Sequence, residues 1–281
     1  MQLTIVVHTE RPDSKLGPVI DCLYNQTVRD LDVWIAGVTP PADLADIQAA
    51  YPVGVLTFPG GTTTAAMLNE AFARAQTDLV VTLDGSWMPR DARWLMNLTR
   101  HFQDLNVAAV SGTDYDEERV SVVDPWYSQD LLDFLVTPEL TINFANAAFR
   151  RDMWRRFGFD SSNGTCADKH WAYQVLREGQ TLVMDYDSRC HQSEALTRDE
   201  AFRRYWAMNL SFGAFIQTRQ DIKLLYQRAL SDVLKSRSLR SLARIYKMWP
   251  VIKQQRYWRP DPAQAMLARE QFVRTGKKWA L

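Results

Sequence analysis

The sequence is poor in cysteine. Its three cysteines, Cys22, Cys166 and Cys190, lie far apart and form no C-x-x-C pair. Their spacing therefore offers neither a zinc knuckle nor a dithiol redox motif. A sparse and odd set of thiols is typical of a reducing compartment, because small secreted domains rely on paired cysteines. We therefore expect the protein to work in the cytoplasm.

Long hydrophobic runs are also missing. No apolar stretch approaches the roughly 18 to 20 residues that a membrane-spanning helix needs. The first residues, Met1 to Val7, have the pattern of a short strand and lack the basic start and longer apolar core of a signal peptide. Any association with a membrane is therefore expected to be peripheral, on its cytoplasmic face.

The whole chain has no net charge, because 33 basic residues balance 33 acidic ones, but the two signs are unevenly distributed. Residues 198–281 hold 18 Lys and Arg against 6 Asp and Glu, which leaves 15 against 27 for residues 1–197. The basic end suits an anionic partner, which would be anionic lipid, nucleic acid or the acidic part of the same chain. Solvated helix faces would produce the same charge pattern.

The whole chain of 281 residues is long enough for one large domain or for a domain with a helical appendage. In its first part, apolar segments with the period of a strand alternate with segments that have the period of a helix. Strands are predicted at residues 3–8, 31–36, 53–58 and 79–83, and helices at 14–25, 44–50 and 64–75. Such alternation predicts a mostly parallel α/β sheet. Ligands of such sheets bind beyond the carboxyl ends of the strands, where Thr9, Glu10, Gly37 and Asp84 fall.

The remainder is less regular. A helix is predicted at residues 90–103 and a strand at 108–111, residues 140–149 mix strand and turn, and a helix at 168–178 precedes a strand at 182–186. From Thr197 onward the pattern is helical, basic and rich in Trp and Tyr. We therefore expect residues 1–195 to form one α/β domain and residues 196–281 to form a helical region.

Four stretches carry a resemblance to a known family. They are Thr4–Pro12 with Cys22–Thr27; Gly60-Gly61 leading to Met67–Ala71; Val80–Pro89; and Asn146–Arg151 with Gly158–Asp160, Ala167–Lys169 and His191. In this order and spacing the chain resembles the inverting family-2 glycosyltransferases, over roughly residues 1–195. The resemblance implies the GT-A fold, a Rossmann-like sheet flanked by helices, with a C-terminal helical extension.

The resemblance also implies an activity, the transfer of a sugar from a nucleotide-sugar donor, expected to be UDP-linked, to a hydroxyl of a glycan or lipid-linked glycan. The positions that match donor-binding residues of the family are Thr9, Glu10, Arg11, Gly61, Asn69, Asp84 and Ser86. For Thr9, Glu10 and Arg11, a polar loop after a strand is the alternative interpretation.

The Asp-x-Asp motif of the family is degenerate here. Its second Asp holds Mg²⁺ or Mn²⁺ against the diphosphate, because hard cations prefer oxygen ligands. That position is Ser86, so Asp84 and His191 are the predicted metal ligands and the presence of a metal is left open. Asp-x-Asp also occurs at residues 114–116 and 185–187, which we interpret as loop or strand-end carboxylates.

Inversion at the anomeric carbon requires one carboxylate to take the proton of the attacking hydroxyl. The family uses the Asp of a Glu-Asp pair, and the matching pair here is Ala167-Asp168. Asp168 is therefore the predicted catalytic base, with capping of the following helix as the alternative. Lys169 and His170 would contact phosphate or acceptor, or form a solvated helix start, and Trp171 is expected in the core.

Two other functions remain open at this point. Basic helices with Trp and Tyr suit an anionic membrane surface, and they also suit nucleic acid, as in an enzyme that glycosylates bases of phage DNA. Ser86, Ala167 and Gly37 stand where the family has carboxylates, which is also the pattern expected of a non-catalytic binding protein derived from it.

Overall fold

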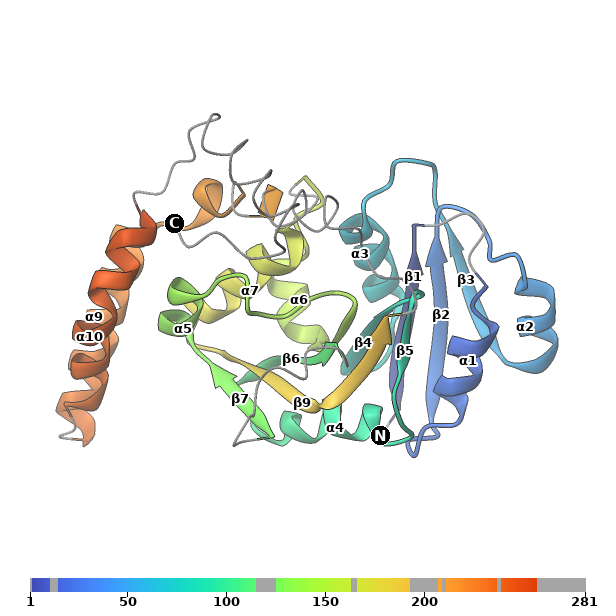
Figure 1. Cartoon of the computed structure of the whole chain (residues 1–281), viewed down its shortest axis with the longest axis horizontal. Helices are drawn as coiled ribbons and strands as arrows, with labels where there is room; N and C mark the ends of the chain where they lie inside the picture. The colour runs from blue at the N-terminus through green and yellow to red at the C-terminus, as the bar shows by residue number, and fades with distance from the viewer. Residues whose placement is uncertain are drawn as a thin grey trace, which may run out of the picture. The chain divides into compact units, whose positions relative to one another are not determined.

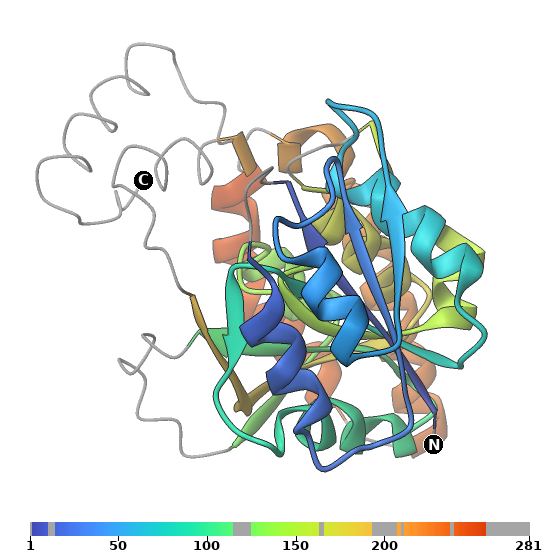
Figure 2. The same ribbon diagram turned by 90° about the vertical axis from the view of Figure 1, so that its right-hand side faces the viewer.

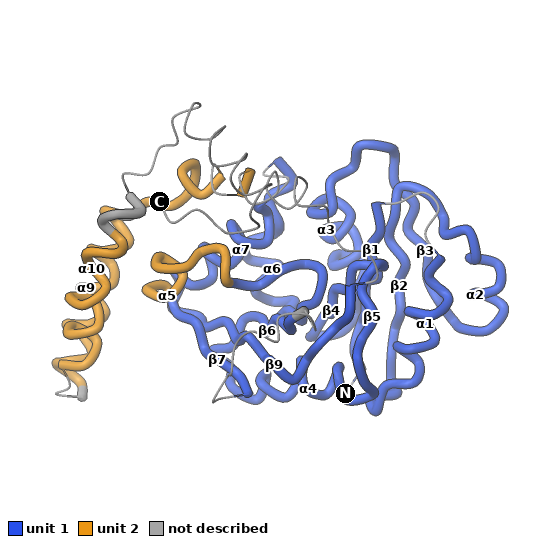
Figure 3. The backbone as a smooth tube through the Cα atoms, in the orientation of Figure 1, with its two compact units in different colours: residues 1–130, 141–194 blue, residues 131–140, 195–281 orange. Residues whose placement is uncertain are grey.

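The computed structural model describes most of the chain. The described residues are 2–10, 15–114, 125–162, 166–192, 207–208, 211–236 and 239–256. The chain divides into two compact units, the first made of residues 1–130 and 141–194 and the second of residues 131–140 and 195–281 (Figure 3). The sequence did not indicate that residues 131–140 group with the C-terminal part.

One mixed sheet organises the first unit (Figure 1). In the described residues it has nine strands, in the order β3-β2-β1-β4-β8-β6-β9-β5, with β7 also paired to β9. Their bounds are β1 Leu3–Thr9, β2 Leu31–Gly37, β3 Val53–Thr57, β4 Leu79–Asp84, β5 Trp87–Pro89, β6 Val107–Asp114, β7 Trp126–Gln129, β8 Asn146–Arg150 and β9 Thr181–Gln192. Strands β5, β7 and β8 run against the other six. The predicted mostly parallel α/β class is confirmed.

Strand β1 is central, and every one of its seven residues is buried. It pairs in parallel with β2 on one side and β4 on the other. A parallel strand covered on both faces shows a continuous apolar run instead of an alternating one. This burial explains why β1 was predicted to within one residue of its bounds.

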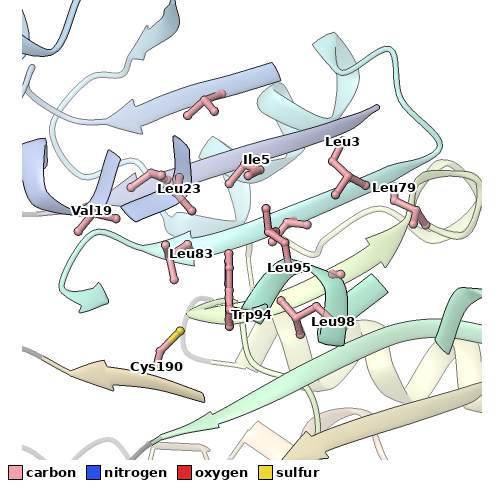
Figure 4. Packing of buried hydrophobic residues seen from close by; sticks show 14 of the residues in the cluster. Leu3, Ile5, Val19, Leu23, Leu79, Leu83, Trp94, Leu95, Leu98 and Cys190 are labelled. Carbon is pink, nitrogen blue, oxygen red and sulfur yellow. The ribbon is translucent and has the colours of Figure 1, made fainter. Parts of the chain in front are cut away.

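Helices cover both faces of the sheet (Figure 1). They are α1 Gly17–Tyr24, α2 Leu44–Ala50, α3 Thr64–Arg74, α4 Trp94–Arg100, α6 Arg151–Phe157 and α7 Ala167–Arg177, and a short 3₁₀ turn, η1 His101–Gln103, follows α4. Leu3 and Ile5 of β1 pack in one cluster with Leu23 of α1 and Leu95 of α4 (Figure 4). Helices α1 and α2 lie side by side (Figure 2), where Asp43 accepts hydrogen bonds from the backbone at the start of α1.

An aromatic cluster fills the layer beside α3 and α7. Phe159 stacks edge-on to Phe72 at 5.0 Å and to Phe144 at 4.7 Å, and Trp171 meets Phe149 at 5.2 Å between ring centroids. Trp171 is fully buried, so the prediction that it belongs to the core is confirmed. The cluster fixes the chain around residues 144 and 159 next to the first turns of α7.

Several elements escaped prediction or have other bounds. The helix predicted from residue 90 begins at Trp94, because residues 87–89 form β5 against β9. The four residues of β7 are too few for a periodic signal, and the seven-residue helix α6 was also missed. Strand β9 continues to Gln192, so residues 185–187 lie inside a strand, and their interpretation as loop or strand-end carboxylates is wrong.

The second unit is helical in its described residues, which agrees with the predicted C-terminal extension. It contains α5 Leu131–Val136, α9 Thr218–Ser236 and α10 Arg240–Arg256. Arg244 of α10 forms an ion pair with Asp133 of α5, and Ser241 donates to Asp232 of α9. None of the helices in the described part of the chain is long and apolar enough to cross a membrane.

Candidate functional site

The ends of three adjacent strands meet at one edge of the sheet. Thr9 of β1 lies opposite Gly37 of β2, and His8 lies opposite Asp84 of β4. A side chain at Gly37 would stand 3.1 Å from the Thr9 carbonyl oxygen, so the position requires a small residue. Three of the predicted strand-end residues are thereby brought together. Arg11 lies outside the described residues.

Asp84 begins a tight turn that its own side chain stabilises. Its Oδ1 accepts hydrogen bonds from the Ser86 backbone N–H at 2.8 Å and from the Ser86 hydroxyl at 2.7 Å. The Gly85 N–H donates to the His8 carbonyl at 2.9 Å, and a β-carbon on Gly85 would stand 2.6 Å from Leu16. Ser86 therefore orients the Asp84 carboxylate, in the place where the family has a second carboxylate.

The described residues do not assemble a metal site by themselves. They contain no group of three or more His, Cys, Asp or Glu side chains placed to hold a cation. Asp84 offers one carboxylate whose Oδ1 already accepts two hydrogen bonds, and His191 lies exposed in β9 opposite Met88 of β5. Hard divalent cations take six or more oxygen ligands. By themselves these side chains supply too few ligands for such an ion, which would need phosphate oxygens of a donor and water to complete its shell, and the metal roles of Asp84 and His191 stay predictions.

The start of α3 adjoins the same edge. Glu10 accepts a hydrogen bond from the Thr64 hydroxyl in the first turn of α3, where a negative charge favours the helix dipole. Thr63 is the N-cap, with its hydroxyl accepting from the Ala66 N–H at 3.3 Å. Gly61 has φ of +84°, which a residue with a β-carbon rarely adopts. Glu10 thus contacts the first turn of α3, and Gly61 lies in the turn just before that helix.

Asn69, within α3, has a structural role. Its amide oxygen accepts from the Trp154 indole N–H at 2.8 Å and the Phe159 N–H at 2.9 Å. Its amide nitrogen donates to the Phe159 carbonyl at 2.7 Å. The predicted contact of Asn69 with the donor stays a prediction. In the structure Asn69 positions the segment that leads to Asp160.

A loop of residues 141–145 links this edge of the sheet to the start of α7. Its carbonyl oxygens accept hydrogen bonds from the ends of both central strands and from a lysine of the helix. The contacts are His8 Nε2 with the Phe144 oxygen at 3.0 Å, the Asp84 N–H with the Ala145 oxygen at 3.0 Å, and Lys169 Nζ with the Ile142 oxygen at 2.5 Å and the Thr141 oxygen at 3.3 Å. One loop therefore holds both the Asp84 turn and the first turn of α7.

Asp168 lies in that first turn, one residue after the helix begins at Ala167. Cys166 is the N-cap residue and makes no side-chain capping bond, so the interpretation of Asp168 as the helix cap is wrong. Asp168 Oδ1 accepts from the Lys169 N–H at 2.8 Å, and its Oδ2 lies 3.2 Å from Lys169 Nζ. The Asp168 side chain is 15% exposed. It is a mostly buried carboxylate beside a cation.

Lys169 and His170 are not a solvated helix start, and that part of the prediction is corrected. Lys169 is buried, and His170 Nδ1 lies 3.2 Å from Asp160 Oδ2. The Ser162 hydroxyl, at 2.6 Å, is the main reason that the pKa of Asp160 lies below its ordinary value; the Ser162 N–H and the positive charge of protonated His170 add to this, against the effect of burial. Both side chains therefore have carboxylate partners.

Asn146, which opens the fourth matching stretch, lies in the sheet. It is fully buried at the start of β8, where its side chain accepts from the Trp94 indole at 2.9 Å and donates to the Ser188 carbonyl at 3.0 Å. A β-carbon on Gly112 would stand 1.9 Å from the same Ser188 oxygen. Asn146 and Gly112 thus fix the irregular pairing of β6 with β9.

A second carboxylate network lies around β9. The buried Asp185 Oδ2 accepts from Arg100 Nη2 at 2.8 Å and lies 2.6 Å from His101 Nε2. Burial lowers the pKa of Arg100, but the charges and hydrogen bonds of Asp185 and Asp187 outweigh it and raise that pKa. These side chains join α4 and η1 to the sheet. Residues 115–116 of the other Asp-x-Asp lie outside the described residues.

Comparison with known proteins finds the likeness in structure alone. No family model matches the sequence, and no curated protein matches it. A mannosyltransferase from Pyrobaculum calidifontis, in complex with GDP-Man and Mn²⁺, has a TM-score of 0.61 at 17% identity and covers 99% of this chain and 88% of its own. TarS residues 1–349 from S. aureus, in complex with UDP-GlcNAc, has a TM-score of 0.56 at 11% identity and covers 100% and 93%.

A third structure is glucosyl-3-phosphoglycerate synthase from Mycobacterium tuberculosis in complex with Mn²⁺, UDP and glucosyl-3-phosphoglycerate. Its TM-score is 0.56 at 11% identity, and it covers 75% of this chain and 78% of its own. These neighbours are glycosyltransferases of the GT-A type, and their likeness confirms the predicted GT-A fold. At such low identity it shows the fold alone.

Proposed function

We propose that the protein is an inverting glycosyltransferase of the family-2 type, which moves a sugar from a nucleotide-sugar donor to an acceptor hydroxyl. One observation carries the proposal. Within a GT-A fold, the loop of residues 141–145 ties the Asp84 turn to the first turn of α7, which contains Asp168. One carboxylate thereby has a fixed place at the end of β4 and the other at the start of a helix, as transfer between two bound substrates requires.

The donor is proposed to bind at the ends of β1 and β4, against Thr9, Glu10, Gly61, Asp84 and Ser86. The leaving diphosphate develops negative charge, which fixed donors such as hydroxyl and N–H groups stabilise without reorganisation. Ser86 carries both groups; they donate to Asp84 Oδ1 in this structure and would have to exchange that partner for a diphosphate oxygen. We propose a UDP-linked sugar, with Arg11 as a further contact that remains a prediction.

The acceptor is proposed to approach Asp168. The carboxylate takes the proton of the acceptor hydroxyl as that oxygen attacks the anomeric carbon, while the bond from this carbon to the diphosphate oxygen breaks. Attack from the face opposite the leaving group inverts the configuration. Lys169, 3.2 Å from Asp168 Oδ2, holds the carboxylate in place. We propose a hydroxyl of a glycan or lipid-linked glycan as the acceptor.

A thermal-shift screen of UDP- and GDP-sugars, each with and without Mn²⁺, tests the proposal together with an assay of nucleotide release. We expect one donor to raise the melting temperature and to release its nucleotide slowly in the absence of an acceptor. The Mn²⁺ arms decide whether Asp84 and His191 take part in metal binding. If no donor stabilised the protein or was turned over, the proposal would fail in favour of a non-catalytic binding protein.

A further inference from the structure

Helix α9 exposes a row of large apolar side chains. Tyr226, Leu230 and Leu234 are spaced four residues apart, and all three are exposed, Leu234 to 85%. Residues four apart lie on one side of a helix. Ile222, four residues before Tyr226, begins the same row and is buried, whereas Leu225 and Ala229 are buried on another side of the helix. The exposed part of the row, from Tyr226 to Leu234, is therefore additional to the residues that pack α9 in its own unit.

Helix α10 also exposes large apolar side chains. Tyr246, Trp249 and Val251 are exposed, Tyr246 to 78%, and Leu239 just before the helix is 65% exposed. Ile245 and Ile252 are the buried residues of α10. We call Tyr226, Leu230, Leu234, Leu239, Tyr246, Trp249 and Val251 the apolar surface of the second unit. Large apolar side chains that stay exposed on two packed helices offer a surface for interaction.

The charges around the apolar surface are almost all of one sign. The exposed charged residues on the described side chains of α9 and α10 are Arg219, Lys223, Lys235, Arg240, Arg244 and Lys247, against Asp232 alone. Lys223 lies one turn before Tyr226, and Lys247 follows Tyr246 directly. Asp133 compensates one of these cations by pairing with Arg244. The partner must therefore be both anionic and able to accept aliphatic side chains.

We propose that helices α9 and α10 bind the surface of an anionic lipid bilayer. Leu230, Leu234 and Leu239 gain from burial among acyl chains, whereas phosphates and base edges offer leucine no such environment. Tyr and Trp suit the boundary between headgroups and acyl chains, and Lys and Arg suit anionic headgroups. A second copy would bring the same cations together. The membrane proposal does not depend on sugar transfer.

Flotation with vesicles tests the inference with the full chain. We expect binding to vesicles of phosphatidylcholine with 30–40% phosphatidylglycerol (about one anionic headgroup in three, within the range where basic surfaces bind) and at least tenfold weaker binding to phosphatidylcholine alone. Leu230→Gln with Leu234→Gln should lower binding at least tenfold, as should Lys223→Glu with Lys247→Glu. Matched controls in the first unit are Leu105→Gln, whose side chain is 80% exposed, and the exposed Arg93→Glu, which should bind like the parent protein.

Three results would overturn the inference: an equal loss of vesicle binding in the controls, retention of vesicle binding in both double variants, or no binding of the parent protein to anionic vesicles. Light scattering and a duplex-DNA binding assay identify the alternatives, because a dimer lost in Leu230→Gln with Leu234→Gln would assign the surface to a second copy. Nucleotide release by the double variants separates the membrane proposal from the proposal of sugar transfer. We expect the double variants to release nucleotide at the parent rate. If no form of the protein transferred sugar, the vesicle-binding result would still stand.

Discussion

The two carboxylates of the candidate site have different surroundings. Asp84 is held by neutral donors, the N–H and hydroxyl of Ser86, and has no cationic partner among the described residues. Asp168 is held by the N–H and the ammonium of Lys169, which itself is bound by two carbonyl groups of the 141–145 loop. Asp84 is thus arranged as an oriented negative group at a strand end, whereas Asp168 is a charge-compensated group fixed in a helix.

The largest effect is expected from removal of the proposed base, Asp168. Asp168→Asn keeps the size of the side chain and removes the base, so kcat should fall about 10²- to 10⁴-fold with the protein still folded. Steady-state kinetics and circular dichroism measure the two properties. Asp46→Asn is the matched control, because Asp46 is an exposed acid in the first turn of α2. An unchanged rate in Asp168→Asn would remove the assignment of the base.

The next effect tests the charge compensation. Lys169→Met leaves Asp168 without its cation and two buried carbonyl groups of residues 141 and 142 without a donor. Removal of one partner of a buried pair costs about 3–5 kcal/mol of unfolding free energy. Urea denaturation measures it, with Lys15→Met at an exposed position as the control. A loss below about 1 kcal/mol would contradict the structural role of Lys169, since exposed pairs reach that value.

A third change gives Asp84 the neighbouring carboxylate that the Asp-x-Asp motif has at the position of Ser86. Ser86→Asp restores Asp-x-Asp and places a second carboxylate beside Asp84, which should tighten Mn²⁺ binding about tenfold, because carboxylate oxygens are preferred ligands of hard cations. Calorimetric titration with Mn²⁺ reports the change. Ser86→Asn, which adds similar volume without charge, should leave Mn²⁺ binding as in the parent. Equal effects of both variants would show that charge is not the cause.

The smallest effect concerns pH. The pKa of Asp160 is held below its ordinary value of 3.8 mainly by the Ser162 hydroxyl. Its ionised form therefore stabilises the fold above pH 3.8, and this contribution is lost as the pH falls through the lowered pKa. Asp160→Asn should lower the unfolding free energy at pH 7 by less than about 1 kcal/mol, as expected for a partly exposed pair. The difference from the parent should shrink in melts recorded below pH 3.8.

Buried parallel strands were predictable because burial on both faces leaves a continuous apolar run in the sequence. β1 and β4 were found in this way, and with them the strand-end positions of Thr9 and Asp84; β2 and β3 were also found, although fewer of their residues are buried. The start of α7 was also found within one residue. By contrast, β5 has three residues and β7 has four, too few for any period to be recognised.

The identity of the residues that hold the site could not be predicted. Lys169 is 27 or 28 positions from the carbonyl groups that it binds, and His8 is 136 positions from Phe144. These pairs arise because β8 enters the sheet antiparallel to β4, which places the loop before β8 at the end of β4. The same strand order buries Asn146, which its polar character alone would have placed at the surface.

The sequence by itself determined the α/β class and the parallel strands at the start of the chain, because hydrophobic periodicity is a local property; the two carboxylates came from a resemblance, and their roles stay predictions. Only the tertiary structure decided what each carboxylate contacts: Ser86 at two positions from Asp84, and Lys169 with a distant loop beside Asp168. It also decided that the large apolar residues of α9 and α10 stay exposed, because one face of each helix suffices to pack the second unit.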